Sequence, residues 1–239
     1  MKQKNNKTND LNEENNNSTG INKKKKTLII RLIVILIEFL LIILGILVLT
    51  YVRNSQIAKP IIYLYPTTNE EITVKLGYSN KITTSYPKYT YGWNVLAKPN
   101  GDLLELNTNK KLYSLYYESD PVYNFKVEDN GFVVERKDVS DFLEKKLSIL
   151  GLTERETEEF IIYWLPKLEK NKYNYIRFAT LDEINKNMPL EINPNPDTTI
   201  RILMTFKKLS HPINVQEQNL EIPNRTGFVA VEWGGTEIK

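Results

Sequence analysis

The feature that most constrains this chain is an apolar run over residues 32–52, LIVILIEFLLIILGILVLTYV, which contains one charged side chain, Glu38. As a helix rising 1.5 Å per residue, this run would be about 31 Å long, which matches the hydrocarbon thickness of a bilayer. A surface helix of a soluble domain keeps a polar face, which this run lacks. The sequence therefore predicts one membrane-spanning helix, within a transmembrane segment at residues 27–53.

Positive charge lies mainly on one side of this run. Four consecutive lysines at residues 23–26 precede it, whereas the other side begins with only Arg53 and Lys59. Because basic residues are retained in the cytoplasm, we expect a cytoplasmic N-terminus and an extracytoplasmic C-terminal domain at the cell membrane. A cleaved signal peptide is the alternative, but its apolar region usually has about 7 to 15 residues. The longer run favours an uncleaved signal anchor.

The residues before the helix have a composition that does not support a folded core. Residues 1–26 carry seven lysines, eight asparagines and no aromatic residue. Such a segment cannot bury enough apolar surface to offset its loss of conformational entropy on folding. We therefore expect a disordered basic tail there, a linker at residues 54–59 and one extracytoplasmic domain at residues 60–239.

The basic character of the chain comes from its first 53 residues. The whole chain has 32 basic and 29 acidic side chains, of which 23 basic and 25 acidic ones follow residue 53. A nearly neutral domain lacks the concentrated basic surface that phosphate recognition requires. We expect no nucleic-acid partner, and the lipid bilayer is the first partner that the sequence predicts.

Cysteine and histidine usage limits the chemistry of the chain. There is no cysteine, so disulfides, thiol catalysis and thiolate metal sites are excluded. The one histidine, His211, cannot form a multi-histidine metal site within one chain. The sequence predicts no metal and no cofactor.

Glu38 is the charged residue inside the apolar run. A carboxylate at depth in a bilayer costs on the order of 3 kcal/mol on insertion scales, and such residues often contact a partner helix. Arg31, seven residues earlier, lies on nearly the same helical face and near the membrane surface, where snorkelling also relieves this cost. An assembly factor that acts through this helix is therefore one hypothesis, and structural tolerance of Glu38 is the other.

The first half of the domain carries strand patterns. Apolar and polar side chains alternate within residues 71–79, which is typical of a half-buried strand. Residues 93–106 predict a hairpin whose centre, Pro-Asn-Gly-Asp at 99–102, has turn chemistry. This half predicts a β-meander or sandwich. Further strands are expected at residues 60–66, 81–89, 111–117 and 122–136, the last region with a turn at residues 129–131.

A helical period replaces the alternation after residue 138. Val139, Leu143 and Leu147 recur at helical spacing and Gly151 follows as a C-terminal cap, so the sequence predicts a helix at residues 139–150.

A second helix is predicted to begin after Thr153. Thr153 and Glu156 have the spacing of a capping box, and the acidic residues 154–159 complement the dipole of a helix N-terminus without any catalytic role. Pro166 is expected to kink or end this helix, because its ring removes a backbone donor.

Strand patterns return in the last third of the chain, at residues 173–180, 189–194, 199–209 and 227–233. Two helices inserted between strand-rich regions, without regular strand-helix alternation, predict an α+β fold with mostly antiparallel strands. One transmembrane helix precedes this domain.

Two carboxylates are candidate catalytic residues, Glu232 and Glu191. Glycosidases place two carboxyl groups across a cleft at a defined separation, which linear spacing cannot establish. A Ser-His-Asp triad would have to use His211, and no nucleophile-elbow motif is present. A membrane-tethered hydrolase acting on envelope polymers through Glu232 and Glu191 is therefore one functional hypothesis.

Aromatic residues crowd the first half of the domain, where ten of the fourteen tyrosines lie between residues 63 and 123. Tyrosine combines an apolar ring with a polar tip, which suits stacking on sugars or contact with a protein, but it is also a preferred strand residue. The candidate binding residues are Tyr86, Tyr89, Tyr91, Trp93 and Trp233.

Four segments carry a resemblance to a protein family. They are KPIIYLYP (59–66), YGWNVLAKPNGDL (91–103), LGLTERETEEFIIYWLPKLEKN (150–171) and VEWGGTEI (231–238). Together they resemble an uncharacterised group of bacterial extracytoplasmic domains with KPxIYLYP and VEWGGTE motifs. The resemblance implies a domain boundary at Lys59 and a bacterial envelope setting, and no activity or ligand.

The leading expectation for function is a membrane-anchored binding or interaction domain at the cell envelope. Its partner would be an envelope protein or glycan, because the domain is nearly neutral and rich in tyrosine.

Overall fold

The computed structural model describes residues 26, 30–47, 58–120, 123, 125–221 and 223–238. The chain divides into two compact units, Met1–Arg53 and Asn54–Lys239. The predicted disordered tail lies outside the described residues except for Lys26, and residues 54–57 of the predicted linker also lie outside them.

The first unit contains one long apolar helix, Ile30–Leu47. It has 18 residues with a mean hydropathy of 2.9, and none of this stretch is buried. The prediction of a helix long and apolar enough to cross a membrane is confirmed, and residues 48–52 of the predicted run lie outside the described part of the chain. Glu38 lies within the helix.

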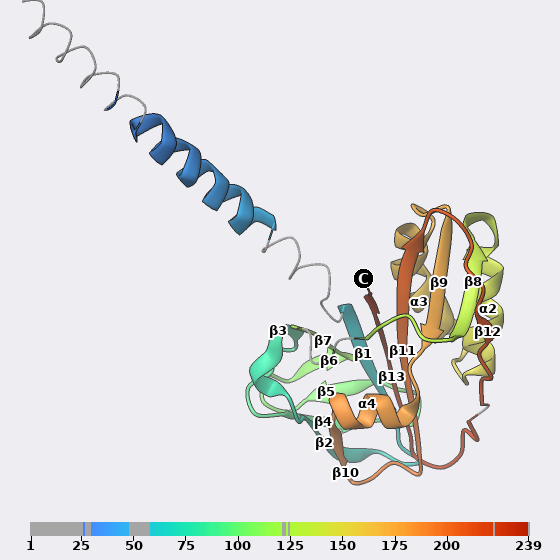
Figure 1. Ribbon diagram of the computed structural model, residues 1–239. Coiled ribbons are helices and arrows are strands. Elements are labelled where there is room, and N and C mark those ends of the chain that lie inside the picture. Colours follow the sequence, from blue (N-terminus) through green and yellow to red (C-terminus); the bar gives the residue numbers. More distant parts are fainter. Residues whose placement is uncertain are drawn as a thin grey trace, which may run out of the picture. The chain divides into compact units, whose positions relative to one another are not determined.

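The second unit is built on two β-sheets (Figure 1). Neighbouring strands of the larger, eight-stranded sheet are antiparallel except in the pairs β11–β13 and β12–β8, which are parallel. Its strands, in spatial order, are β12 (Gln216–Glu217), β8 (Asn130–Glu135), β9 (Tyr173–Phe178), β11 (Thr198–Leu209), β13 (Val229–Glu237), β1 (Ala58–Tyr65), β7 (Leu115–Ser119) and β3 (Ile82–Tyr86).

The smaller sheet has five strands, all antiparallel. The hairpin predicted at residues 93–106 is confirmed as β4 and β5, whose turn is closed by the Lys98 amide donating to the Asp102 carbonyl at 2.9 Å. Gly101 in this turn has a φ of +87°, which favours glycine. In spatial order the strands are β10 (Leu190–Asn193), β2 (Glu70–Leu76), β4 (Trp93–Ala97), β5 (Leu103–Glu105) and β6 (Lys110–Leu112).

Three α-helices belong to the described part of the second unit. They are α2 (Val139–Ile149), α3 (Glu154–Leu168) and α4 (Leu181–Asn187), and two 3-10 turns are η1 (Ser79–Lys81) and η2 (Arg136–Asp138). The first two confirm the predicted pair of helices, and the capping box of Thr153 and Glu156 forms as expected. The third was not predicted, although Thr180 and Glu183 form a capping box of the same kind.

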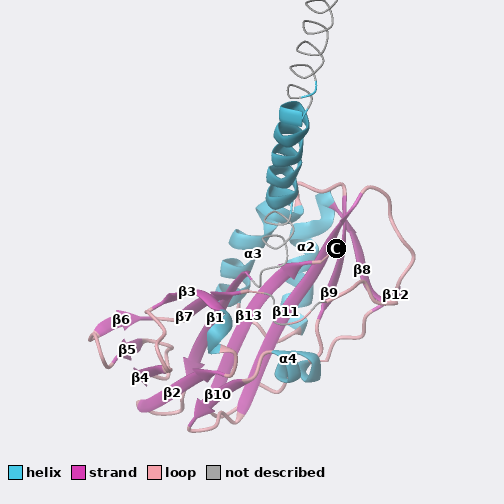
Figure 2. Ribbon diagram, turned by 60° about the vertical axis from the view of Figure 1, so that its left-hand side comes forward, coloured by secondary structure: helices cyan, strands magenta, loops and turns pink. Residues whose placement is uncertain are grey.

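Helices α2 and α3 cover one face of the larger sheet, and the smaller sheet together with α4 covers the other face (Figure 2). On one face, Leu143 of α2 and Trp164 of α3 pack in one core with Val231 of β13. On the other face, Ile184 of α4 and Val74 of β2 belong to a second core. The α+β fold with mostly antiparallel strands is therefore confirmed, as two cores that share one sheet.

The central strands β11 and β13 lie between these two cores. Ile200, Ile202, Met204 and Phe206 face the helix side, as their alternation predicts, whereas Leu203 belongs to the opposite core. Strands that are buried on both faces are apolar at nearly every position, so a charge within them requires a partner.

One local prediction is wrong, the turn at residues 129–131. Asn130 and Gly131 belong to β8 rather than to a turn, because the Asn130 carbonyl accepts a hydrogen bond from the Tyr175 hydroxyl at 2.8 Å and its side chain accepts one from Arg177. The strands of the first half agree with the predicted meander or sandwich: β2, β4, β5 and β6 are neighbours in the smaller sheet, and β2 and β4 pack in one core against β1 and β7 of the larger sheet.

Pro166 does not end α3, which continues to Leu168. The missing proline amide leaves the Ile162 carbonyl without its helical partner, and Ile162 lies on the exposed side of the helix, where solvent can hydrogen-bond that carbonyl.

Candidate functional site

The site is centred on a buried ion pair between the two central strands. Arg201 of β11 and Glu232 of β13 are direct neighbours in the parallel register, and the exposed fractions of their side chains are 2% and 6%. The Arg201 Nε atom donates to Glu232 Oε2 at 2.7 Å. Burial alone would lower the pKa of Arg201, but the adjacent Glu232 carboxylate raises it. Arg201 is therefore held in its charged form.

Two tyrosines extend the pair into the core. The Tyr117 hydroxyl donates to Glu232 Oε1 at 2.6 Å, so its oxygen accepts a hydrogen bond from Tyr78. Burial raises the pKa of Tyr117 well above its ordinary value, and the carboxylate of Glu232 raises it further. The hydroxyls thus keep their protons, and both oxygens of Glu232 are satisfied.

Asn185 of α4 extends the network towards the surface. Arg201 Nη1 donates to Asn185 Oδ1 at 2.9 Å. A guanidinium group has no acceptor atom, so the amide must turn its oxygen to Arg201. The Nδ2 atom of the exposed Asn185 side chain is then left as a donor for a ligand.

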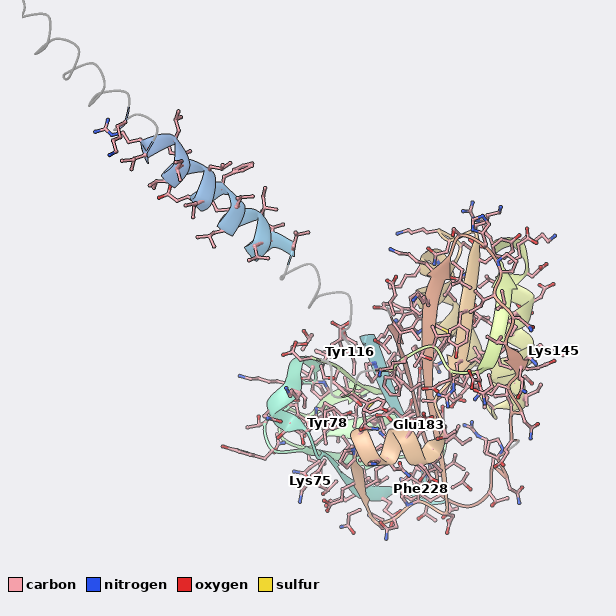
Figure 3. All side chains as sticks on the ribbon, in the orientation of Figure 1. Lys75, Tyr78, Tyr116, Lys145, Glu183 and Phe228 are labelled. Atoms are coloured by element: carbon pink, nitrogen blue, oxygen red, sulfur yellow. The ribbon has the colours of Figure 1, made fainter. Side chains whose placement is uncertain are left out.

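Two adjoining cavities, of about 550 Å³ and about 440 Å³, meet at this network. They share Leu181, Thr199 and Arg201, and we name them together the α4 hollow. In Figure 3, Glu183 marks α4, and Tyr78, which shares a core with Ile184 of α4, lies on the side of the larger sheet that the smaller sheet covers. Other polar residues of the hollow are Thr180, Asp182, Asn185, Glu191, Asn195, Gln218, Asn219 and Glu221.

The charges around the α4 hollow are predominantly negative. Asp182, Glu191 and Glu221 are exposed residues of its walls. Arg201 is the basic residue among those that form the walls, and Glu232 neutralises it. The hollow therefore disfavours phosphate or carboxylate ligands and suits hydroxyl, amide or amine groups.

The two candidate catalytic carboxylates have different surroundings. Glu191 is exposed and belongs to the hollow, whereas Glu232 is not among the residues of its walls. Both carboxylate oxygens of Glu232 already accept hydrogen bonds, from Arg201 and from Tyr117, so neither is free to face a substrate. The structure does not bring these two residues together as a catalytic pair across a cleft.

The five candidate aromatic residues are also separated. Tyr86 and Tyr91 are 52% and 88% exposed, whereas Trp93 and Trp233 are fully buried in opposite cores. Tyr89 packs edge-on against Trp93 with 4.7 Å between ring centroids. Only the first two therefore present most of a ring to a partner, and Trp93 and Trp233 cannot contact one directly.

A metal site has no support within the described ranges. No group of three or more histidine, cysteine, aspartate or glutamate side chains in that part of the chain could hold a metal ion.

Sequence reasoning missed Arg201, Asn185 and Tyr117 as members of one network. The available signal was one charge in each of two otherwise apolar segments, Arg201 in TIRILMTF and Glu232 in FVAVEWGG. Opposite charges within buried strands predict a pair, because an isolated buried charge is too costly. The position of Asn185 had no comparable signal.

Comparisons of the chain with protein-family models, with curated proteins and with solved structures find no match. The resemblance of its four segments to an uncharacterised bacterial extracytoplasmic group stays a prediction.

Proposed function

We propose that this chain is a single-pass membrane protein whose C-terminal domain, outside the cytoplasm, binds an uncharged or amine-bearing glycan of the bacterial cell envelope in the α4 hollow. The observation that carries the proposal is the Asn185 amide, which Arg201 orients at the wall of a hollow whose other charges are acidic. Saccharides present many hydroxyl and amide acceptors that such a donor can bind.

The apolar helix Ile30–Leu47 supports the anchor in this proposal. The lysines at 23–26 favour a cytoplasmic N-terminus by the positive-inside bias. A membrane-tethered hydrolase that uses paired carboxylates is less well supported, because Glu232 is neutralised by Arg201 and is not part of the hollow's walls.

Binding of defined oligosaccharides to the full chain in nanodiscs tests the proposal. Suitable probes are a tetramer of N-acetylglucosamine, its de-acetylated amine form and an anionic polyglycerol phosphate, measured by calorimetry. We expect binding of the first two and not of the third. Substitution Asn185→Ala should weaken binding by about tenfold, which corresponds to roughly 1.4 kcal/mol. Glu191→Gln should weaken binding of the amine form more than that of the acetylated form.

Matched controls are Asn80→Ala and Glu71→Gln, exposed residues that are not among those of the hollow. Unchanged binding by Asn185→Ala and Glu191→Gln would remove the hollow as the site. If Tyr91→Ala alone abolished binding, the exposed tyrosines Tyr86 and Tyr91 would be the binding site in place of the α4 hollow. If the native chain released new reducing ends and Glu191→Gln did not, the hydrolase hypothesis would be favoured.

A further inference from the structure

The chain joins the second unit at one end of the larger sheet. β1 is the first described element of that unit and begins at Ala58, which pairs with Gly235 near the end of β13. β11 runs parallel to β13 and therefore ends on the same side. Leu209 of β11 pairs with Tyr173, the first residue of β9. This end of the sheet thus combines the starts of β1 and β9 with the ends of β11, β13 and α3.

Lysines gather at this end of the sheet. In Figure 3, side-chain nitrogen atoms cluster where β9 begins and β11 ends. Acidic residues at the same strand and helix ends are fewer, namely Glu118, Asp120, Glu169 and Glu237, and Glu237 lies 4.0 Å from Lys208. We name the lysine cluster the basic end; its members are Lys59, Lys167, Lys170, Lys172, Lys207 and Lys208.

Two of these lysines share one aromatic ring. The Nζ atoms of Lys59 and Lys167 lie 4.8 Å and 3.7 Å from the centre of the Tyr163 ring. Burial lowers the pKa of Lys167 and the charges of Lys170 and Lys59 lower it further, whereas the Glu118 carboxylate opposes this shift. Cations from β1 and α3 are therefore held close together around one ring.

The end of β8 adds no net charge to this surface. Arg136 and Lys137 are matched there by Glu135 and Asp138, and Lys137 lies 3.3 Å from Glu135. The α4 hollow, in contrast, adjoins the start of β11 and the end of β9, which is the opposite end of the larger sheet. The charge of the domain is therefore divided between two ends, although its sum is near zero.

We propose that the basic end binds the anionic lipid headgroups of the membrane in which the chain is anchored. The inference rests on the membrane anchor of the proposed function but not on its glycan. Clustered lysines next to an anchored segment attract anionic lipids over distances of about a Debye length, some 8 Å at physiological salt. With the basic end bound to lipid, the hollow at the other end of the sheet would face away from the membrane.

Energy transfer from a dye on the full chain to acceptor-labelled headgroups in nanodiscs tests this orientation. The chain has no cysteine, so one introduced cysteine is labelled uniquely. Ser210→Cys, after β11, reports on the basic end, and Asn224→Cys, before β13, reports on the opposite end; both residues are exposed. We expect greater transfer from the first site in phosphatidylglycerol discs than in phosphatidylcholine discs, and no such gain from the second.

The gain at Ser210→Cys should be lost at 1 M salt, a test that needs no further substitution. It should also be lost when Lys167, Lys170, Lys207 and Lys208 are changed to glutamine, whereas Lys75→Gln together with Lys145→Gln should leave it intact. Equal transfer from both sites in both lipids would overturn the proposal. Absence of the chain from purified discs would instead overturn the membrane anchor. Glycan binding is measured separately, so its loss would bear on the proposed function and not on the basic end.

Discussion

Among the described residues, two arginine–glutamate pairs have a buried carboxylate, and they differ in what holds them. Glu232 receives hydrogen bonds from Arg201 and Tyr117, all from strands of the larger sheet. Glu156 receives them from Arg225 and Tyr65, and also from the Thr153 amide that it caps. Each carboxylate thus has one guanidinium and one tyrosine hydroxyl as partners, but only one of them also serves a helix N-terminus.

The difference in exposure separates their roles. The Arg225 side chain is 25% exposed, whereas that of Arg201 is 2% exposed and donates onward to Asn185 in the α4 hollow. The Glu156 pair fastens α3 to β1 and to the segment before β13, which is a structural role. The Glu232 pair positions the Asn185 side chain at the wall of the α4 hollow. An ion pair with a purely structural role would not need this contact.

Removing the arginine of each pair should give the largest contrast. Arg201→Met leaves Glu232 buried and charged, so we expect a loss of about 3–5 kcal/mol in the free energy of unfolding. Arg225→Met should cost about 1–3 kcal/mol, because solvent, Thr153 and Tyr65 still hydrogen-bond Glu156. Urea unfolding of the detergent-solubilised chain, followed by tryptophan fluorescence, measures both. The double variant Arg201→Met/Glu232→Leu should recover part of the loss, and equal losses in the two single variants would contradict the comparison.

Removing the tyrosine hydroxyls should give a smaller contrast in the same direction. Tyr117→Phe leaves Glu232 Oε1 unsatisfied in a fully buried site, at a cost of about 1–3 kcal/mol. Tyr65→Phe should cost about 0.5–1.5 kcal/mol, because Arg225 also donates to Glu156 Oε1. The same unfolding assay applies. A larger loss of unfolding free energy from Tyr65→Phe than from Tyr117→Phe would show that exposure does not decide which pair contributes more stability.

The smallest effect is the pH dependence of the Glu156 pair. Burial alone would raise the pKa of Glu156, but hydrogen bonds from Arg225, the Thr153 amide and Tyr65 outweigh it, and the pKa is lowered. A lowered folded pKa gives stability that is present above the unfolded value of about 4.3 and is lost as pH falls through the folded value. The stability difference between the native chain and Glu156→Gln should therefore be constant from pH 6 to 8 and shrink in acid. A stability difference that grows in acid would show that folding raises the pKa of Glu156 instead of lowering it.

Local patterns in the sequence were sufficient for most of the elements. The Thr153–Glu156 capping box predicted the start of α3, and the alternation within residues 71–79 predicted β2. Turn propensity failed at Asn130, where contacts from Tyr175 and Arg177 hold the segment in a strand. Local signals predict local hydrogen bonds well, and they fail where partners distant in sequence supply stronger ones.

The candidate site was less predictable than the fold. Glu232 and Glu191 were singled out as a pair of carboxylates, but Arg201, the partner that decides the chemistry of Glu232, was not. Burial of Trp93 and Trp233 could not be derived from composition, because aromatic residues suit both a core and a binding face. Which tyrosines are exposed depends on how the two sheets pack.

The sequence by itself determined the apolar helix, the near-neutral domain and the α+β class, because each depends on composition or on periodicity along the chain. Only the tertiary structure decided that Arg201 pairs with Glu232, that Asn185 completes the network and that lysines and carboxylates gather at opposite ends of one sheet. The physical reason is that strand order and register bring together residues that lie tens of positions apart, and neither is encoded in local spacing.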